Sequence, residues 1–185
     1  IQFDAAGDNC YSNAYMHFSK QKMNQTRALW TTQLEAPILS EISLVKNHYN
    51  QQWELAVQDQ DYNLYLISTK GEILWKRKLE DAIIGTIEQI DVFKNKKLQL
   101  LFNTSNKLFL IDRKGRDVKS FPIRLKHKTE LGLALFDYQK QRNYRILLSC
   151  GKHQYMFDQN GKRINGWKLN KTKSKVTQTA QHFVV

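Results

Sequence analysis

The sequence predicts an all-β protein whose strands form a β-propeller of four-stranded antiparallel blades. A pattern of apolar strand, polar turn ending in glycine and second strand returns along the chain, with Gly71, Gly115 and Gly161 spaced 44 and 46 residues apart. The strand stretches alternate apolar and polar residues and are rich in β-branched and aromatic types. A period of about 45 residues with several strands in each unit is typical of a propeller, whereas a helical solenoid would show a period of about 3.6 residues.

The repeat divides the chain into units that span residues 1–34, 35–79, 80–125 and 126–169, and each unit ends on a leucine. Within a unit, the third and fourth strands flank the turn glycine, where the chain needs a positive φ to reverse its direction. The first unit starts at a second strand. The expected strands besides those at the turns are Ile1–Ala5, Tyr11–Phe18 and Ala28–Leu34, then Ile42–Lys46, Glu54–Val57, Ile87–Phe93, Leu98–Asn103, Leu131–Phe136 and Arg145–Cys150.

Large aromatic residues recur in the fourth strand of every unit. Trp75 lies four residues after its turn glycine, and Phe121 and Trp167 each lie six residues after theirs. Even offsets place these side chains on one face of the strand. Trp30 stands at the same distance from its closing leucine as Trp75 does. We expect all four aromatics to be largely buried between neighbouring blades.

The chain accounts for about four blades, which is the lower limit for propellers. Residues Val176–Val185 are expected to form the first strand of a next blade, or to complete the first one. Bulky aromatics at every interface would strain so narrow a ring, and the chain starts with Ile1 rather than Met. These features favour part of a propeller of seven or eight blades, whose open edges would drive self-association. The alternative is a closed four-bladed ring.

The segment Asn63-Leu-Tyr-Leu-Ile-Ser-Thr-Lys-Gly-Glu-Ile-Leu-Trp75 resembles the repeat of the quinoprotein, or PQQ-like, β-propeller superfamily. Other units match in part, with Phe109 and Tyr155 at the tyrosine position. WD40 repeats fit less well, because no Gly-His…Trp-Asp pair recurs at this period. The resemblance implies a propeller in the bacterial cell envelope or periplasm. It implies no single function, since the superfamily includes PQQ dehydrogenases, an outer-membrane assembly lipoprotein and many uncharacterised envelope proteins.

Charge is the unusual feature of the composition: 29 Lys and Arg oppose 17 Asp and Glu, which gives a formal net charge of +12. A basic balance indicates acidic partners such as nucleic acid. Most basic residues are spread over turns and alternate strand positions, however, which favours a solvated surface. A third basic stretch runs over residues 168–175, and the two denser stretches supply the candidate polyanion contacts Lys94, Lys96, Lys97, Arg124, Lys126 and Lys128.

The sequence lacks the patterns of a catalytic or metal centre. The resemblance implies adjacent cysteines for a quinone dehydrogenase, whereas Cys10 and Cys150 lie 140 residues apart. The segment Asp59-Gln-Asp-Tyr-Asn63 imitates the start of a calcium loop, but Leu64 and Lys70 stand where Gly and Glu belong. The five histidines show neither i, i+4 spacing nor cysteine companions. We therefore expect no enzyme activity, metal or small-molecule cofactor, and an Asx-rich hairpin turn at residues 59–63.

Two classes of function follow. The first is a non-catalytic scaffold that binds a protein or glycan through its faces and rim loops, with the polar insertion Ser19–Thr26 as the best candidate contact. The second is a binder of nucleic acid or another polyanion through the basic stretches. The even spread of charge favours the scaffold and makes nucleic acid the less favoured partner.

Overall fold

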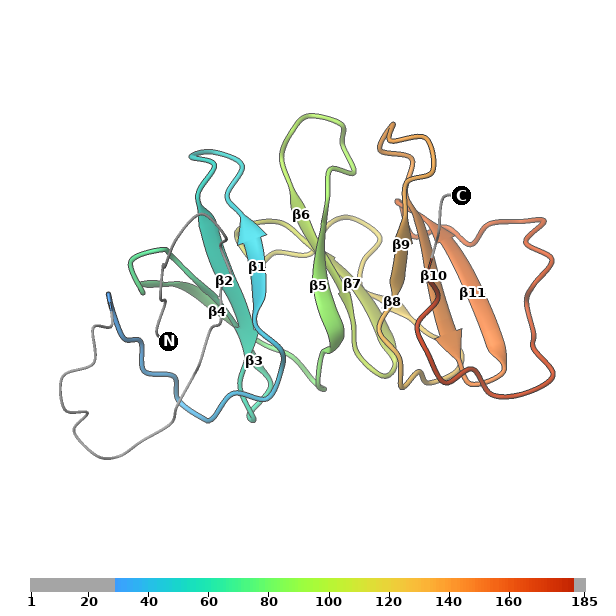
Figure 1. The fold of residues 1–185 in the computed structure, drawn as a ribbon, viewed down its shortest axis with the longest axis horizontal. Helices are drawn as coiled ribbons and strands as arrows, with labels where there is room; N and C mark the ends of the chain where they lie inside the picture. The colour runs from blue at the N-terminus through green and yellow to red at the C-terminus, as the bar shows by residue number, and fades with distance from the viewer. Residues whose placement is uncertain (1–28, 182–185) are drawn as a thin grey trace, which may run out of the picture.

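The computed structural model describes residues 29–181, and every regular element among them is a β-strand (Figure 1). Three antiparallel sheets stand side by side in chain order, and no helix in this part of the chain could cross a membrane. The first sheet contains β1 (Ser43–Lys46), β2 (Trp53–Gln58), β3 (Asn63–Ile67) and β4 (Ile73–Lys78). The second contains β5 (Ile84–Ile90), β6 (Gln99–Asn103), β7 (Lys107–Ile111) and β8 (Ile123–Arg124). The third contains β9 (Ala134–Phe136), β10 (Arg145–Cys150) and β11 (His153–Asp158).

Each sheet is a meander, in which strands that follow one another in sequence also pair in space. The central strands are continuous apolar runs, such as Leu64-Tyr-Leu-Ile67 in β3, because both of their faces are buried. The edge strand β4 instead begins with the exposed Ile73 and then alternates exposed and half-buried positions over Leu74–Lys78. The prediction of an all-β, antiparallel protein is therefore confirmed for the described residues.

Alternate residues of the central strands face opposite neighbours, so apolar layers form between successive units. Equivalent cross-strand pairs occupy the face toward the preceding unit: Val57 with Tyr65, Phe102 with Phe109, and Leu148 with Tyr155. In the layer between the first and second sheets, the rings of Phe102 and Phe109 stack with centroids 5.1 Å apart. The repeated register shows that the units are built on one plan.

Each turn glycine lies against an aromatic side chain of the preceding unit, and each has a positive φ. A Cβ atom added to Gly71 would lie 2.5 Å from the Trp30 ring, and one added to Gly115 would lie 3.2 Å from the Trp75 ring. A Cβ atom on Gly161 would lie 3.1 Å from the Phe121 ring and closer still to the Ile123 side chain. The Trp75 indole N–H also donates to the carbonyl oxygen of Arg113, 2.7 Å away. Glycine is thus required twice at these positions, for the backbone angle and for the close approach.

The prediction that all four aromatics are largely buried is correct for Phe121, which is 7% exposed. It holds only in part for Trp30, Trp75 and Trp167, which are half-buried against the apolar clusters. Trp75 lies against the turn of the next unit and packs partly buried on the layer between the first two sheets. Trp167 packs on the outer face of the third sheet.

Side-chain amides tie each unit to the next. The Gln58 amide accepts from the Ile83 N–H at 2.7 Å and donates to the Asp81 carbonyl at 3.0 Å. Asn103, one unit later, accepts from the Leu133 N–H at 2.8 Å and donates to the Leu131 carbonyl at 3.2 Å. These buried amides satisfy backbone groups of the connecting segments, which would otherwise lose hydrogen bonds on burial.

The prediction of four strands in every unit is correct only in part. The fourth strand has six residues in β4 but two in β8, and the third sheet has no fourth strand among the described residues. Ser120 has a φ of 76° and Gly166 a φ of 84°, and a left-handed residue interrupts extended pairing. Only isolated bridges remain there: Ile111–Asp117, His153–Lys171 and Phe157–Arg163.

The two ends of the described chain also differ from the prediction. Residues 29–34 of the expected strand Ala28–Leu34 form no strand, although Trp30 and Leu34 pack against the first sheet. Residues 176–181 of the expected strand Val176–Val185 form none either, although Ala180 packs partly buried on the outer face of the third sheet. The expected strands Ile1–Ala5 and Tyr11–Phe18, the insertion Ser19–Thr26 and Cys10 lie outside the described residues.

Replacing Trp75 with Ala should lower the free energy of unfolding by about 3 kcal/mol, because the ring is lost from the layer between the first two sheets. Trp53 is the matched control, since its side chain is 55% exposed. Trp53→Ala should change stability by less than about 0.5 kcal/mol. Urea denaturation midpoints of the two variants measure the difference, and equal midpoints would contradict the packing role of Trp75.

Replacing Gly71 with Ala should destabilise the protein more than replacing Gly151 with Ala. Both glycines have a positive φ, of 83° and 64°, so both variants incur the left-handed backbone penalty of about 1–2 kcal/mol. Only Gly71 lies under a ring, whereas a Cβ on Gly151 would meet nothing within 4 Å. The difference between the two unfolding free energies therefore reports the contact with Trp30, and a difference of zero would refute it.

Candidate functional site

The first hairpin of each sheet projects from the same end of the molecule (Figure 1). We call these three hairpins, residues 47–52, 91–98 and 137–144, the hairpin rim. Each hairpin presents one exposed aromatic side chain: Tyr49 at 67%, Phe93 at 60% and Tyr138 at 57% exposure. These residues are spaced 44 and 45 apart, so they follow the repeat. The rim therefore carries a row of large apolar side chains at equivalent positions in three consecutive units.

Carboxylates hold two of the hairpins in the same conformation. The Asp91 carboxylate accepts from the N–H groups of Asn95 and Lys96 at 3.0 and 2.7 Å. The Asp137 carboxylate accepts from the N–H groups of Gln141 and Arg142 at 3.2 and 2.8 Å. These bonds stabilise positive φ angles on basic residues, which are Lys94, Lys96, Lys140 and Arg142.

Neighbouring hairpins are bonded to one another. The Arg142 guanidinium forms an ion pair with the buried Asp91 carboxylate at 2.9 Å, and the Lys94 ammonium donates to the Asn143 amide oxygen at 2.8 Å. Between the first two hairpins, the Leu98 N–H donates to Nδ1 of His48 at 3.1 Å. The rim is thus a connected surface rather than three independent loops.

A buried carboxylate lies directly under the first hairpin. Glu54 in β2 is buried, and it accepts from the Asn47 amide at 2.8 Å and forms an ion pair with Arg113 from the next unit. The Arg113 guanidinium in turn lies 5.9 Å from the centre of the Tyr49 ring. The exposed ring is therefore packed on a cation that a buried charge holds in place.

His48 is neutral near pH 7. Its Nδ1 accepts a hydrogen bond, so its proton sits on Nε2, a buried atom with no hydrogen-bond partner among residues 29–181. Desolvation lowers the pKa of His48 below its usual range, and the positive charges of Arg113 and Lys97 lower it further.

The structure separates the candidate polyanion contacts into two groups. Lys94, Lys96 and Lys97 lie on the hairpin rim, before β6. The stretch that contains Arg124, Lys126 and Lys128 lies beside the turn after β6, where the Leu125 and Thr129 N–H groups donate to Asn106 and Ser105. The third basic stretch reaches this second end too, because the Thr172 N–H donates to the Lys152 carbonyl in the β10–β11 turn. The basic stretches therefore form no single surface.

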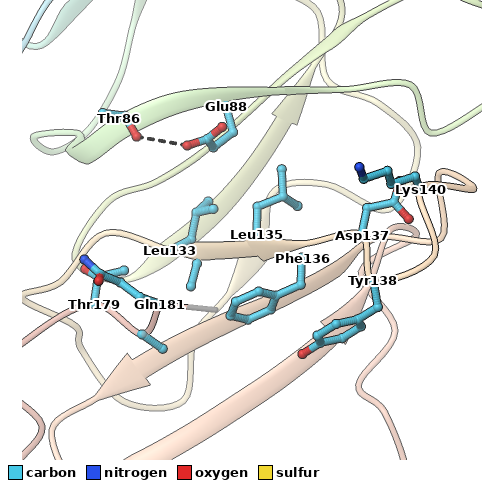
Figure 2. Close-up of a pocket in the computed structure, with 12 residues that line it drawn as sticks. Thr86, Glu88, Leu133, Leu135, Phe136, Asp137, Tyr138, Lys140, Thr179 and Gln181 are labelled. Carbon is cyan, nitrogen blue, oxygen red and sulfur yellow. Dashed lines mark hydrogen bonds between the residues drawn. The ribbon is translucent and has the colours of Figure 1, made fainter. Parts of the chain in front are cut away.

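A groove of about 680 Å³ lies between β5 and β9 (Figure 2). Figure 2 shows Thr86 and Glu88 on one wall, facing Leu133 and Leu135 on the other. The Glu88 carboxylate accepts from the Thr86 hydroxyl at 3.1 Å. Asp137, at the rim end of the groove, already caps its hairpin, so the carboxylates of this groove are engaged within the protein.

The predicted Asx-rich turn at residues 59–63 is confirmed. The buried Asp59 carboxylate accepts from the Asn63 backbone N–H, the Asn63 amide and the Tyr65 hydroxyl, all within 2.8–2.9 Å. Burial acts to raise the pKa of Asp59, but these hydrogen bonds outweigh it and hold the pKa below its usual value. Burial and the Asp59 charge raise the pKa of Tyr65 to about 12.

No cluster of metal-ligating side chains occurs among residues 29–181. Cys150 is a buried thiol in the layer between the second and third sheets, and desolvation raises its pKa to about 11. A thiol with this pKa stays protonated near neutral pH, which makes it a poor nucleophile.

The row of rim aromatics was missed by the sequence analysis, although its signal was present. Tyr49, Phe93 and Tyr138 follow the same period as the turn glycines, and each lies one or two residues after an Asn or Asp. What the sequence did not show is that these rings are exposed, since aromatics in strand-rich chains are more often buried.

No family model and no curated protein matches this chain. Among the solved structures that match are two described as crystal structures of BBS1N in complex with ARL6DN, one soaked with lead and one with mercury. The first is 16% identical with a TM-score of 0.46, and the second is 16% identical with a TM-score of 0.45. Each match covers 70% of this chain and 38% of the other, so the chain spans well under half the length of these structures.

Replacing His48 with Gln should reduce the loss of stability on acidification. Because the folded-state pKa of His48 is lowered, the unfolded chain binds more protons below about pH 6.5, and stability falls as the pH drops through this range. Gln does not titrate, and its amide oxygen is able to accept from the Leu98 N–H. Urea midpoints at about pH 7.5 and about pH 5.5 should therefore differ less in the variant than in the wild type. An unchanged difference would contradict the assignment.

Proposed function

We propose that this chain is a non-catalytic β-propeller scaffold that binds a protein partner through the hairpin rim. The observation that carries the proposal is the row of Tyr49, Phe93 and Tyr138, exposed at equivalent positions in three consecutive units. Aromatic side chains dominate protein interfaces because they bury a large area at a small cost in conformational entropy. A solvated surface has no need for a large ring at the same place in every unit.

The rigidity of the rim supports the same function. Asp91 and Asp137 cap the hairpins, and the Arg142–Asp91 ion pair joins two of them. A partner that binds here orders few groups of the scaffold, so less of the binding free energy is lost as entropy. The exposed Lys96, Lys97 and Lys140 around the rings favour an acidic partner segment.

Polyanion binding is the second candidate, and the other end of the molecule favours it. Lys126, Lys128 and Lys152 are exposed there, together with the basic stretch of residues 168–175. Such binding would weaken steeply with salt through counterion release, whereas a packed aromatic contact would respond little.

Three finer parts of the proposal rest on the sequence. Membership of the PQQ-like superfamily and a place in the bacterial cell envelope rest on the resemblance of the segment around Gly71. Self-association rests on the repeat and on a general property of open sheets: an unpaired edge strand exposes backbone N–H and C=O groups that can pair with another chain.

A peptide selection tests the rim directly. Peptides are first selected from a random displayed library for binding to the full chain. They should bind a Tyr49→Ser, Phe93→Ser, Tyr138→Ser variant at least about 100-fold more weakly, because each lost aromatic contact removes somewhat over 1 kcal/mol of binding free energy. The control variant Leu39→Ser, Tyr62→Ser, Leu169→Ser removes three exposed apolar side chains outside the rim, and it should bind within about twofold of the wild type. Isothermal titration calorimetry gives the affinities.

Two outcomes would overturn the rim as the binding surface. One is equal affinity of the selected peptides for the rim variant and the wild type. The other is an affinity for a mixed-sequence oligonucleotide that exceeds that of every peptide and falls linearly with the logarithm of salt concentration, which would establish the polyanion function instead.

A further inference from the structure

Two histidines, one that follows the second sheet and one in the third sheet, stack at the end of the molecule opposite the hairpin rim. The rings of His127 and His153 lie 3.8 Å apart, centroid to centroid, with only 4° between their planes. His127 follows β8, and His153 opens β11. Nδ1 of His127 is hydrogen-bonded to the Tyr155 hydroxyl, which fixes the orientation of the pair.

The Tyr155 hydroxyl is available for this contact because the third sheet has Cys150 where the first sheet has Asp59. In the first sheet the equivalent Tyr65 hydroxyl donates to Asp59, two residues after the paired Val57. The residue two after Leu148, the partner of Tyr155, is Cys150 and carries no carboxylate. The hydroxyl bonds instead to His127, which lies in the segment between the second and third sheets.

The backbone around the pair is held in place from three sides. The Thr129 N–H donates to Ser105 at 2.8 Å and its hydroxyl donates to the Ser149 carbonyl at 2.7 Å. On the other side, His153 and Lys171 form an antiparallel bridge, and the Gln154 N–H donates to Asn170 at 3.0 Å. The two imidazoles and the Lys171 backbone therefore belong to a fixed framework.

Uncompensated positive charge surrounds the pair. Lys126 precedes His127 and Lys171 lies beside His153; both are exposed, and neither forms an ion pair with a carboxylate among residues 29–181. Desolvation, His127, Lys171 and Lys126 together lower the pKa of His153. The other charged or titratable groups near the pair include Tyr155, Cys150, Lys152 and Arg163, which lies 4.8 Å from the centre of the Tyr155 ring. They also include Lys128, the Asp81 carboxylate that accepts from Ser105 beside it, and the exposed Lys175–Glu130 ion pair.

From this arrangement we propose that His127, His153, Lys126 and Lys171 form a binding site for a tetrahedral dianion of the phosphate class, either inorganic phosphate or a phosphate monoester. Imidazolium and ammonium groups are strong donors to such anions. A face-to-face imidazole pair repels a second positive charge, and a dianion at its edge supplies the compensating charge. This site is independent of the hairpin rim and of the partner proposed for it.

Binding and proton uptake are coupled at such a site. The bound dianion favours the protonated imidazoles, so it raises the pKa of His153, and by linkage its affinity increases as the pH falls. Sulfate is the suitable first probe, because it stays a dianion over the whole range in which histidine titrates. Any change of sulfate affinity with pH is then caused by protonation of the protein and not of the anion.

NMR of the histidine side chains tests the proposal with the full chain. Titration with sodium sulfate at constant ionic strength should shift the His127 and His153 ring signals along a saturating curve. Affinity should be at least about threefold higher at about pH 6 than at about pH 7.5, as expected when a nearby imidazole becomes charged. A Lys126→Gln, Lys171→Gln variant should bind at least about tenfold more weakly.

The control variant Lys96→Gln, Lys97→Gln removes the same charge from the hairpin rim and should bind sulfate like the wild type. Both variants change only exposed lysines, so both are expected to stay folded. Inorganic phosphate and a phosphoserine peptide, compared in the same titration, distinguish a free anion from a phosphorylated partner as the ligand. The proposal is wrong if the ring signals shift without saturating, or if the two lysine variants lose affinity equally.

Discussion

The contact between an aromatic ring and the turn glycine of the next unit is the constraint on which the rest of the structure depends. A ring lies flat on a turn only where no Cβ intervenes, and the turn itself needs a positive φ. Gly71, Gly115 and Gly161 meet both requirements at once. The contact sets the position of each sheet relative to the preceding one. Equivalent cross-strand pairs therefore lie in the apolar layers between units.

Regular spacing of the sheets is what turns three separate hairpins into one surface. Because the sheets stand side by side in chain order, Arg142 of the third hairpin contacts Asp91 of the second, and His48 of the first accepts from the backbone of Leu98. Rings that protrude from rigid, connected hairpins lose little entropy on contact with a partner. The stacking that stabilises the fold and the presentation of the rim thus have the same geometric origin.

The sheets differ from one another in their buried polar side chains. Asp59 holds the Tyr65 hydroxyl in the first sheet, whereas Cys150 in the third sheet leaves the Tyr155 hydroxyl to His127. The outer face of the third sheet differs too: the buried amide nitrogen of Gln154 and indole nitrogen of Trp167 have no hydrogen-bond partner in the described part of the chain. In the first sheet, by contrast, the indole N–H of Trp75 donates to the Arg113 carbonyl of the following unit.

The sequence by itself determined the strands, the repeat, the turn glycines and the Asx turn at Asp59, because each depends on local φ preferences and on alternation within a few residues. It failed for the fourth strands, where Ser120 and Gly166 adopt left-handed angles that no periodicity reveals. Only the tertiary structure decided which side chains that are far apart in the sequence meet. The stacking of His127 on His153, the separation of Lys94 from Lys126 and the row of exposed rings all follow from the register and spacing of whole sheets, and no local pattern encodes these.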